Sequence, residues 1–283
     1  MKKTKLGAVV SGGGALGACV VGQLAKKNRS YDYVIGCSTG SLMAPFIALG
    51  DWERLRKAYT SVNQSSIFNI NPFNNKGNIK VIKSIFRIVI GKKTIGETEN
   101  LKKLIDDIFT FDDYLDIRSS GKDVIITVSN LSQRDHTIEY KNIKDCSFEE
   151  FKNWMWVSCN VPVVCSLVKI NDNYYADGGI CESLPLIKAI EDDCTEVDCY
   201  IHDVNGSTGK RKDIENIFHL LGRTFSVIRK EVKDNDIITG LILAKTKNIK
   251  VNTHYLPYEL ASNALVFDQV KMQKWYELGY SIG

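Results

Sequence analysis

The feature that most limits the fold of this chain is a strand–turn–helix pattern that occurs twice in its first 50 residues. An apolar stretch at 5–10 leads into a glycine-rich turn, and apolar residues at helical spacing follow over 15–27. A second apolar stretch at 33–37 leads into another turn of small residues and a helix that runs toward Gly50. Strands that alternate with helices at this short spacing predict a parallel sheet with right-handed crossovers, which is the α/β class.

The remaining elements extend this sheet and its helical layers. We predict strands at 122–131, 136–140 and 196–202, a short hairpin over 166–179, and helices at 51–62, 149–159, 213–232 and 266–279. No repeat and no Gly/Pro/Ser-rich linker divides the chain, so we expect residues 1–283 to form a single α/β domain. Within it, 64–120 is expected to be an insertion or lid, and 195–283 to be the C-terminal part of the same domain.

Composition excludes several classes of function. The net charge of +4 is too small for the basic surface of a typical nucleic-acid-binding protein. The 8 cysteines form no CxxC pair and no Cys/His cluster at ligand spacing, so we expect neither a metal nor another cofactor. The apolar run near the N-terminus is too short for a signal peptide, and no stretch is long enough to cross a membrane. These observations predict a cytoplasmic protein with buried, reduced thiols.

The first turn, VSGGGALG, has two interpretations. As Gly12-x-Gly14-x-x-Gly17 after a strand, it matches a dinucleotide fingerprint, in which backbone N–H groups bind a pyrophosphate. The same N–H groups also suit an oxyanion hole, which stabilises the negative charge that forms on an attacked ester carbonyl. A dinucleotide site needs an acidic residue at the end of the second strand, and the available Asp32 precedes that strand. This position of the acid favours acyl chemistry.

The second turn, GCSTG, lies where the second strand meets its helix. A serine flanked by Gly36 and Gly40 at this place predicts a nucleophile elbow, a strained turn that exposes the Ser38 hydroxyl. The positive N-terminal end of the following helix favours negative charge beside that hydroxyl. Five small residues also occur in loops by chance, so the strand before the motif and the helix after it carry most of the prediction.

A nucleophilic serine needs a base, and none of the 4 histidines lies in a turn of small residues. A desolvated carboxylate held against the serine is an alternative base, because burial raises its pKa. Asp177 is a candidate, since it ends a predicted strand and precedes Gly178 and Gly179, which let other backbone approach closely. Asp-Gly-Gly is also an ordinary β-turn, and on these residues alone both interpretations stand.

Together, GGGALG, GCSTG and DGG in this order resemble the patatin-like phospholipases. The stretch NVPVVCSLVKINDNYYADGGICESLPL is similar to the region around that family's aspartate, and FDQVKMQKWYELGYSIG resembles its closing helix. The resemblance covers most of the chain and is loosest over about 64–120. It implies a three-layer α/β/α sandwich with a mainly parallel central sheet, and a lipid acyl hydrolase with a Ser-Asp dyad that uses neither histidine nor calcium in its chemistry.

Carried over by position, the resemblance implies Ser38 as the nucleophile and Asp177 as the base, with oxyanion N–H groups from Gly12, Gly13 and Gly14. The implied reaction is acylation of the serine by a phospholipid or lysophospholipid, followed by attack of water. An acyltransferase that passes the acyl group to another alcohol or to a thiol is the alternative. A non-catalytic nucleotide-binding module is a third hypothesis, against which the misplaced acid and the DGG turn argue.

Two positions depart from the family pattern. Leu16 stands where many members have a basic residue, just before the last glycine of the first motif. Ser183 stands where an asparagine is common after DGG. Neither change removes a catalytic group, but both bear on substrate choice and on the geometry of the site.

The segment 76–93 contains six basic residues, no acid and several interleaved isoleucines. As a helix, it places four of the basic residues within an arc of about 60° beside a broad apolar face. Such a helix suits peripheral contact with an anionic membrane. It also suits packing of the apolar face on the protein's own core, with the lysines in solvent. Phe68, Phe73 and Phe86 are in addition candidates to line an acyl-chain tunnel.

Overall fold

The computed structural model describes residues 4–74, 76–135, 137–206 and 213–283. Its centre is an eight-stranded sheet in the order β5-β6-β3-β2-β1-β7-β8, with β4 paired to β3 outside this path. The strands are β1 (Leu6–Val10), β2 (Tyr33–Cys37), β3 (Asp123–Asn130), β4 (Ile138–Asn142), β5 (Val168–Ile170), β6 (Asn173–Asp177), β7 (Glu196–Val204) and β8 (Lys250–Leu256). Pairings among β1, β2, β3, β7 and β8 are parallel, whereas those made by β4 and β6 are antiparallel. The predicted mainly parallel sheet is confirmed.

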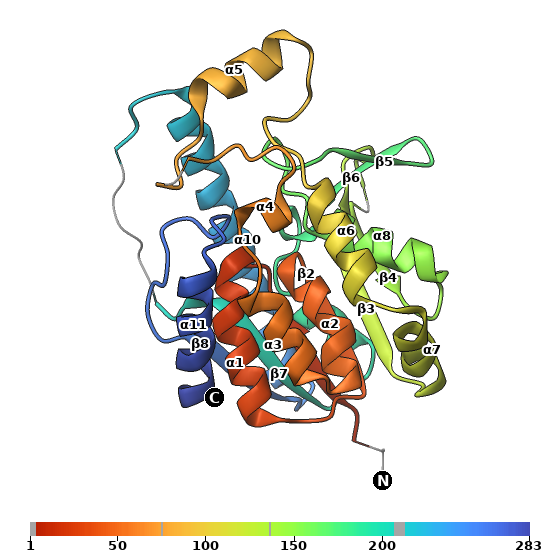
Figure 1. The fold of residues 1–283 in the computed structure, drawn as a ribbon. Coiled ribbons are helices and arrows are strands. Elements are labelled where there is room, and N and C mark those ends of the chain that lie inside the picture. The colour runs from red at the N-terminus through yellow and green to blue at the C-terminus, as the bar shows by residue number, and fades with distance from the viewer. Residues whose placement is uncertain (1–3, 75, 136, 207–212) are drawn as a thin grey trace.

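Helices cover both faces of the sheet (Figure 1). The helices are α1 (Gly17–Lys27), α2 (Thr39–Leu49), α3 (Trp52–Thr60), α4 (Gln64–Ile67), α5 (Val81–Val89), α6 (Glu99–Ile108), α7 (Phe111–Ser119), α8 (Phe148–Ser158), α9 (Leu186–Glu191), α10 (Ile217–Thr246) and α11 (Gln269–Ile282). Along β1, Ala8 and Val10 join the core under α1, α2 and α8, while Val9 joins the core under α9 and α10. This alternation gives the predicted α/β/α sandwich.

The turns that carry the three motifs meet at one edge of the sheet. The chain enters β1 at the bottom of Figure 1, so the carboxyl ends of the parallel strands point toward the end where α5 stands. Ser38 follows β2 directly at this edge. In the neighbouring ladders Cys37 pairs with Thr127, and Val128 pairs with Asp177. The register therefore places the aspartate next to the serine, although β6 runs against its neighbour.

The structure differs from the sequence-based prediction mainly in its C-terminal third. The helix predicted at 213–232 begins at Ile217 and extends to Thr246 as α10, and in this extension Gly240 packs tightly against Leu186 of α9. No strand is predicted over 250–256, where the structure has β8; as the outermost strand it is largely half-exposed and accordingly polar. The predicted strand 136–140 is observed from Ile138, and His136 lies outside the described residues. Among the described residues, none of the helices is long and apolar enough to cross a membrane.

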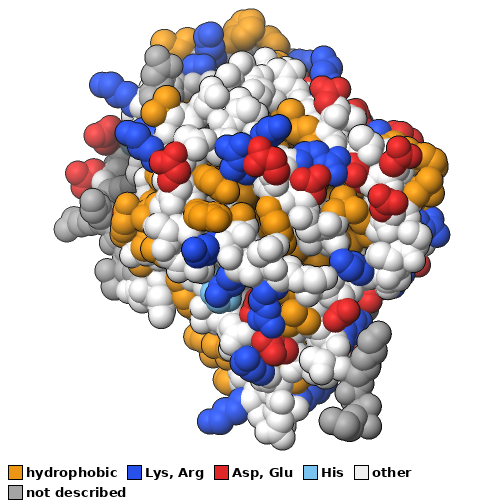
Figure 2. Space-filling view, turned by 60° about the horizontal axis from the view of Figure 1, so that its bottom comes forward, with side chains coloured by type: hydrophobic (Ala, Val, Ile, Leu, Met, Phe, Trp, Pro, Cys, Tyr) orange, Lys and Arg blue, Asp and Glu red, His pale blue; other side chains and the backbone are white. Residues whose placement is uncertain are grey.

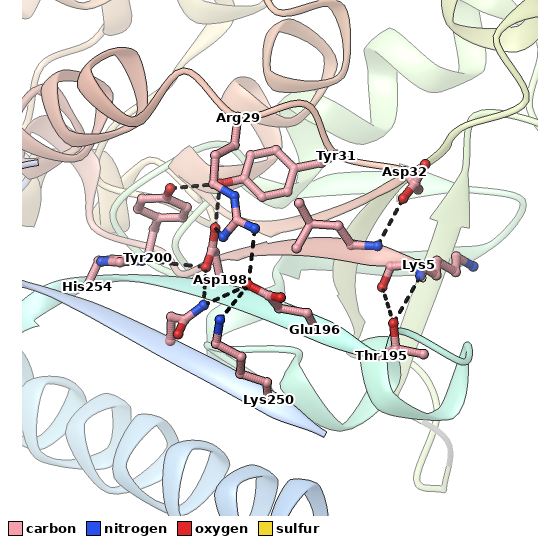
Figure 3. Close-up of polar contacts among 12 residues, drawn as sticks. Lys5, Arg29, Tyr31, Asp32, Thr195, Glu196, Asp198, Tyr200, Lys250 and His254 are labelled. Atoms are coloured by element: carbon pink, nitrogen blue, oxygen red, sulfur yellow. Dashed lines mark hydrogen bonds and ion pairs between the residues drawn. The ribbon is translucent and has the colours of Figure 1, made fainter. Parts of the chain in front are cut away.

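A buried charged network ties the turn after α1 to β7 and β8 (Figure 3). The carboxylate of Asp198 is buried and accepts hydrogen bonds from Arg29, Tyr31 and Asn252, each at 2.8 Å. Burial alone raises the pKa of Asp198, but the nearby His254 ring at 3.8 Å, the hydrogen bonds from Asn252 and Tyr31 and the charge of Arg29 outweigh it. They hold the pKa of this carboxyl well below its usual range, so the group is ionised in the folded protein.

Replacement of Asp198 by asparagine is expected to lower the free energy of unfolding near neutral pH by about 2–3 kcal/mol, because a buried charge network loses its centre. A carboxyl with a depressed folded-state pKa contributes stability above its unfolded value, about pH 4, and this contribution is lost as the pH falls below that value. The difference between the two proteins should therefore shrink in acid. Urea unfolding at neutral and acid pH measures it, with the exposed Asp172→Asn as control; a difference that is constant with pH would contradict the assignment.

Candidate active site

Ser38 stands on the turn between β2 and α2 in a backbone conformation that few residues other than glycine adopt. Its φ is 53° and its ψ is −124°, which is the kind of strained turn that a nucleophile elbow requires. Its N–H donates to Ser158 Oγ at 2.9 Å, and its own Oγ donates to Asp177 Oδ2 at 2.6 Å. The serine is only 6% exposed. The structure thus brings together the two residues that the motifs single out.

Gly36 and Gly40 let this elbow pack against neighbouring backbone. A Cβ on Gly36 would lie 2.2 Å from the carbonyl oxygen of Gly40, and a Cβ on Gly40 would lie 2.3 Å from that of Val10. Both distances are far shorter than any ordinary carbon–oxygen contact. Neither position therefore accepts a side chain unless the backbone of β1, β2 or α2 moves.

Asp177 is buried, and its two carboxylate oxygens have separate partners. Oδ2 accepts the Ser38 hydroxyl, and Oδ1 accepts the N–H of Gly179 at 2.8 Å. Gly178 lets the turn lie directly on β3, since a Cβ there would be 2.4 Å from the carbonyl oxygen of Thr127. The DGG motif is thus a tight turn, as its composition indicates, and this turn also aims the carboxylate at the serine.

The glycine loop after β1 lies beside the serine. A Cβ on Gly12 would be 2.9 Å from the Cβ of Ser38. Gly14 has a φ of 54°, and a Cβ there would be 2.3 Å from the carbonyl oxygen of Ala264. Within the described residues, no backbone hydrogen bond uses the N–H of Gly12 or Gly13. Both donors thus have no backbone acceptor in the part of the chain that the structure describes, and the Cβ position of Gly12 lies near Ser38.

A buried histidine that the motifs do not mark lies under this loop. A Cβ on Gly13 would be 2.2 Å from the Cβ of His202, which belongs to β7. The backbone N–H of His202 donates to Ser11 Oγ at 3.0 Å, and its Nδ1 lies 3.1 Å from the same oxygen. Burial lowers the pKa of His202 to about 3, so the ring is neutral near pH 7. None of the three histidines that the structure describes is hydrogen-bonded to Ser38.

The thiols near Asp177 are held in their protonated form. Burial, together with the charge of Asp177, raises the pKa of Cys37 and of Cys159 well above the usual value. A protonated thiol is a weak nucleophile, so neither cysteine is suited to nucleophilic attack. Across the described ranges, no group of three or more His, Cys, Asp or Glu side chains is placed to hold a metal ion.

An apolar pocket extends from Ser38 along α2. Thr39, Leu42 and Phe46 line it at helical spacing, so it follows this helix for about 12 Å. Side chains of α3, α6 and α8 complete its wall, and apolar groups predominate among them. The pocket is small, with a cavity volume of about 90 Å³, and its apolar lining suits part of a hydrocarbon chain next to the serine.

The aromatic residues considered for a tunnel lie in three different environments. Phe68 lines the pocket. Phe73 is buried against Phe68 but is not part of the lining. Phe86 is an exposed residue of α5 and does not reach the pocket. Sequence alone does not separate these cases, because all three lie in the same segment of the chain.

Arg229 is a residue of the site that no motif marks. It is carried by α10, and a Cβ on Gly12 would lie 3.7 Å from its Nη2. Its positive charge lowers the pKa of Cys37, in opposition to burial and to Asp177. Leu16, where many members have a basic residue, does not indicate that another part of the chain brings a cation here, so sequence reasoning has no signal for Arg229.

An α/β protein with a hydrogen-bonded Ser-Asp pair at the carboxyl edge of its sheet, next to an apolar pocket, has the architecture of the patatin fold. The profile described as Patatin-like phospholipase matches residues 8–190, and the chain belongs to this family. It is 24% identical over 195 residues to "Probable lipid hydrolase 463L" of Invertebrate iridescent virus 6, which covers 65% of this chain and 62% of that protein. Its structure aligns with VipD from Legionella pneumophila at a TM-score of 0.49 and 13% identity, over 99% of this chain and 66% of that one. The chain thus spans less than two thirds of the length of either relative.

The position of Asp32 argues against the dinucleotide interpretation of the glycine turn. Asp32, the acid considered for a ribose, accepts the N–H of Leu6 at 2.9 Å, where β1 begins. It lies at the opposite edge of the sheet from the glycines, so the dinucleotide interpretation does not hold.

Gly40→Ala is expected to lower the free energy of unfolding by about 2 kcal/mol or more, because the new methyl group collides with the carbonyl oxygen of Val10. Gly222→Ala on α10 is the matched control. A Cβ there meets no atom within 4 Å, so this change should stabilise the helix by about 0.5–1 kcal/mol. Urea unfolding of both variants measures the contrast, and equal stabilities would contradict the close packing of the elbow.

Proposed function

We propose that the chain is a lipid acyl hydrolase of the phospholipase A or lysophospholipase type, which cleaves fatty-acyl esters through Ser38 and Asp177. The observation that supports it most is the 2.6 Å hydrogen bond from the serine hydroxyl to the aspartate, buried beside an apolar pocket. The family, and the name of the viral relative, agree with a lipid ester as substrate.

In the proposed acylation, Ser38 Oγ attacks the ester carbonyl carbon while its proton passes to Asp177 Oδ2. The negative charge of the aspartate thereby moves to the carbonyl oxygen, where N–H groups of Gly12, Gly13 and Gly14 stabilise it. Each donor of this kind is typically worth about 3–4 kcal/mol of barrier. The positive N-terminal end of α2 acts in the same sense. The carbon–oxygen bond to the alcohol then breaks, and the alcohol leaves with the proton from the aspartate.

In the proposed deacylation, water attacks the acyl ester on Ser38 while Asp177 accepts one of its protons. The fatty acid leaves when the serine oxygen recovers that proton, and the pair returns to its first state. If another alcohol replaces water, the same steps give an acyltransferase, which stays the alternative. The two reactions differ only in the acceptor, so they are separated by their products.

The apolar lining of the pocket supports a hydrocarbon acyl chain as the transferred group. Each methylene group buried in such a pocket contributes about 0.8 kcal/mol. Substrate affinity should therefore rise with chain length until the space beside Leu42 and Phe46 is filled.

Ser38→Ala and Asp177→Asn are each expected to reduce fatty-acid release by about 10³-fold or more, because each removes one half of the pair that activates the nucleophile. Release from mixed phospholipid vesicles in the presence of EDTA measures this. Ser61→Ala and Asp172→Asn, exposed residues outside the site, are the controls. Full activity of either dyad variant would contradict the mechanism. Transfer of the acyl group to an added alcohol, without release of fatty acid in plain buffer, would favour the acyltransferase.

We further propose that the protein meets its lipid at a membrane surface, through α5. This helix turns its apolar stripe away from the protein, at exposures of 49% to 84%. The stripe consists of Ile82, Ile85, Phe86 and Val89. The helix is attached by its polar side, where Arg87 donates to Glu97 at 2.6 Å. The alternative prediction, that the apolar face packs on the protein's own core, is wrong.

Basic side chains flank this exposed stripe. Lys76, Lys83 and Lys92 are exposed, and none of them has an ion pair within the part of the chain that the structure describes. A lysine near an anionic bilayer contributes about 1 kcal/mol to binding. The opposite end of the molecule differs from α5 in its charges. Figure 2 has this end turned forward, and it shows acidic and basic side chains interspersed. Ser38 and Asp177 lie at the carboxyl ends of the parallel strands, and these ends point toward α5 (Figure 1). A bilayer bound at α5 would therefore lie at the same end of the molecule as the site.

Replacement of Ile82, Phe86 and Val89 by serine is expected to weaken binding to phosphatidylglycerol-rich vesicles by about tenfold or more, because it removes the apolar stripe. Flotation is measured in a Ser38→Ala background, so that the lipid is not consumed. Val270→Ser, at a residue 66% exposed on α11, is the matched control. Unchanged flotation of the triple variant, or equal binding to purely zwitterionic vesicles, would contradict the proposal.

A further inference from the structure

Arg229 covers the gap between the glycine loop and the aspartate turn. It is half-buried on α10, which belongs to none of the three motifs. A Cβ on Gly12 would lie 3.7 Å from its Nη2, and a Cβ on Gly179 would lie 3.8 Å from the same atom. A single guanidinium nitrogen therefore stands next to the backbone of both turns.

The charge of Arg229 has no counter-ion in the described structure. The next two basic residues of the helix are paired, Lys230 with Asp234 at 2.7 Å and Lys233 with Asp203 at 2.5 Å. Arg229 makes no ion pair and no hydrogen bond with any residue in the described ranges. A half-buried cation without a partner is costly unless an anion binds it. This position is therefore suited to contact with an anionic ligand.

The guanidinium also lies on the side of the serine from which a leaving group departs. Ser38 and Gly14 line the apolar pocket. Gly12, Gly179 and Arg229 do not, so the guanidinium lies outside it. When an acyl chain fills the pocket, the alcohol part of the ester must extend away from it. An alcohol that carries a phosphate then brings its negative charge to the two glycines that the guanidinium covers.

We propose that Arg229 binds the phosphate of the substrate and so discriminates phosphate-bearing lipids from neutral glycerides. This inference rests on the proposed acyl-hydrolase function and adds a specificity-determining residue to it. The forked N–H donors of arginine match two phosphate oxygens at once, which a lysine does not achieve. Because Leu16 leaves the glycine loop without its own basic residue, α10 supplies the positive charge.

The test compares two soluble esters that differ only in the headgroup: dihexanoylphosphatidylcholine below its micelle concentration, and dihexanoylglycerol. Arg229→Gln is expected to raise KM for the phospholipid by about tenfold or more, while kcat/KM for the glyceride stays within about twofold. Arg229→Lys should fall between the two, since it keeps the charge and loses the fork. Arg223→Gln, on an exposed turn of the same helix, is the matched control and should change neither value.

A binding measurement separates this inference from the proposed function. In a Ser38→Ala background, calorimetry with an ether-linked phospholipid should show about tenfold weaker binding after Arg229→Gln, whether or not the wild type hydrolyses either ester. If Arg229→Gln lowered kcat/KM equally for both esters, the phosphate contact would be overturned. It would also be overturned if the variant lost activity on neither ester and bound the ether lipid as tightly as before. Competition by inorganic phosphate at the affinity of the ether lipid would mean a free-anion site and would overturn the assignment to a lipid headgroup.

Discussion

The site depends on backbone segments that touch where no side chain fits. Gly40 lies against the carbonyl oxygen of Val10, and Gly178 lies against that of Thr127. These contacts bring the ends of β1, β2, β3 and β6 within reach of one another, and the short hydrogen bond of Ser38 follows from them. A strained serine turn persists only where its surroundings determine it in this way. The same backbone contacts that pack the edge of the sheet therefore also hold Ser38 in its strained position.

The surroundings of the serine divide into two chemically different halves. On one side, α2, α3, α6 and α8 enclose an apolar pocket. On the other, the glycine loop lies beside Ser38, and Arg229 of α10 lies near Gly12 and Gly179 of the two turns. An ester that joins a hydrocarbon to a polar, anionic alcohol matches both halves at once, because each of its ends avoids the environment of the other. On the outside of the molecule, the exposed apolar stripe of α5 likewise lies beside the basic side chains of Lys76, Lys83 and Lys92.

The parts of this structure that sequence predicts are those with local causes. The first two strands and their glycine turns follow from motifs of a few residues, in which strand ends and small side chains are adjacent in the chain. The pairing of Ser38 with Asp177, which lies 139 residues further on, is implied only by the resemblance to the family. The outward orientation of α5 does not follow, since an amphipathic pattern specifies a face but not which neighbour covers it. The position of Arg229 near Gly12 is not predicted from sequence for a related reason. A basic residue on a long helix is ordinary, and only the tertiary fold brings it to Gly12.

The origin of that cation matters for how relatives are compared. Arg229 lies beyond residues 8–190, the part of the chain that the family profile matches. Two members can therefore share all three motifs and still differ in the charge that lies beside the glycine loop. If Arg229 binds the phosphate as proposed, selectivity between lipids would change through a single substitution in α10 while every motif is retained. Comparisons confined to the matched region will group such enzymes together, and a comparison of the helix that follows is what tells them apart.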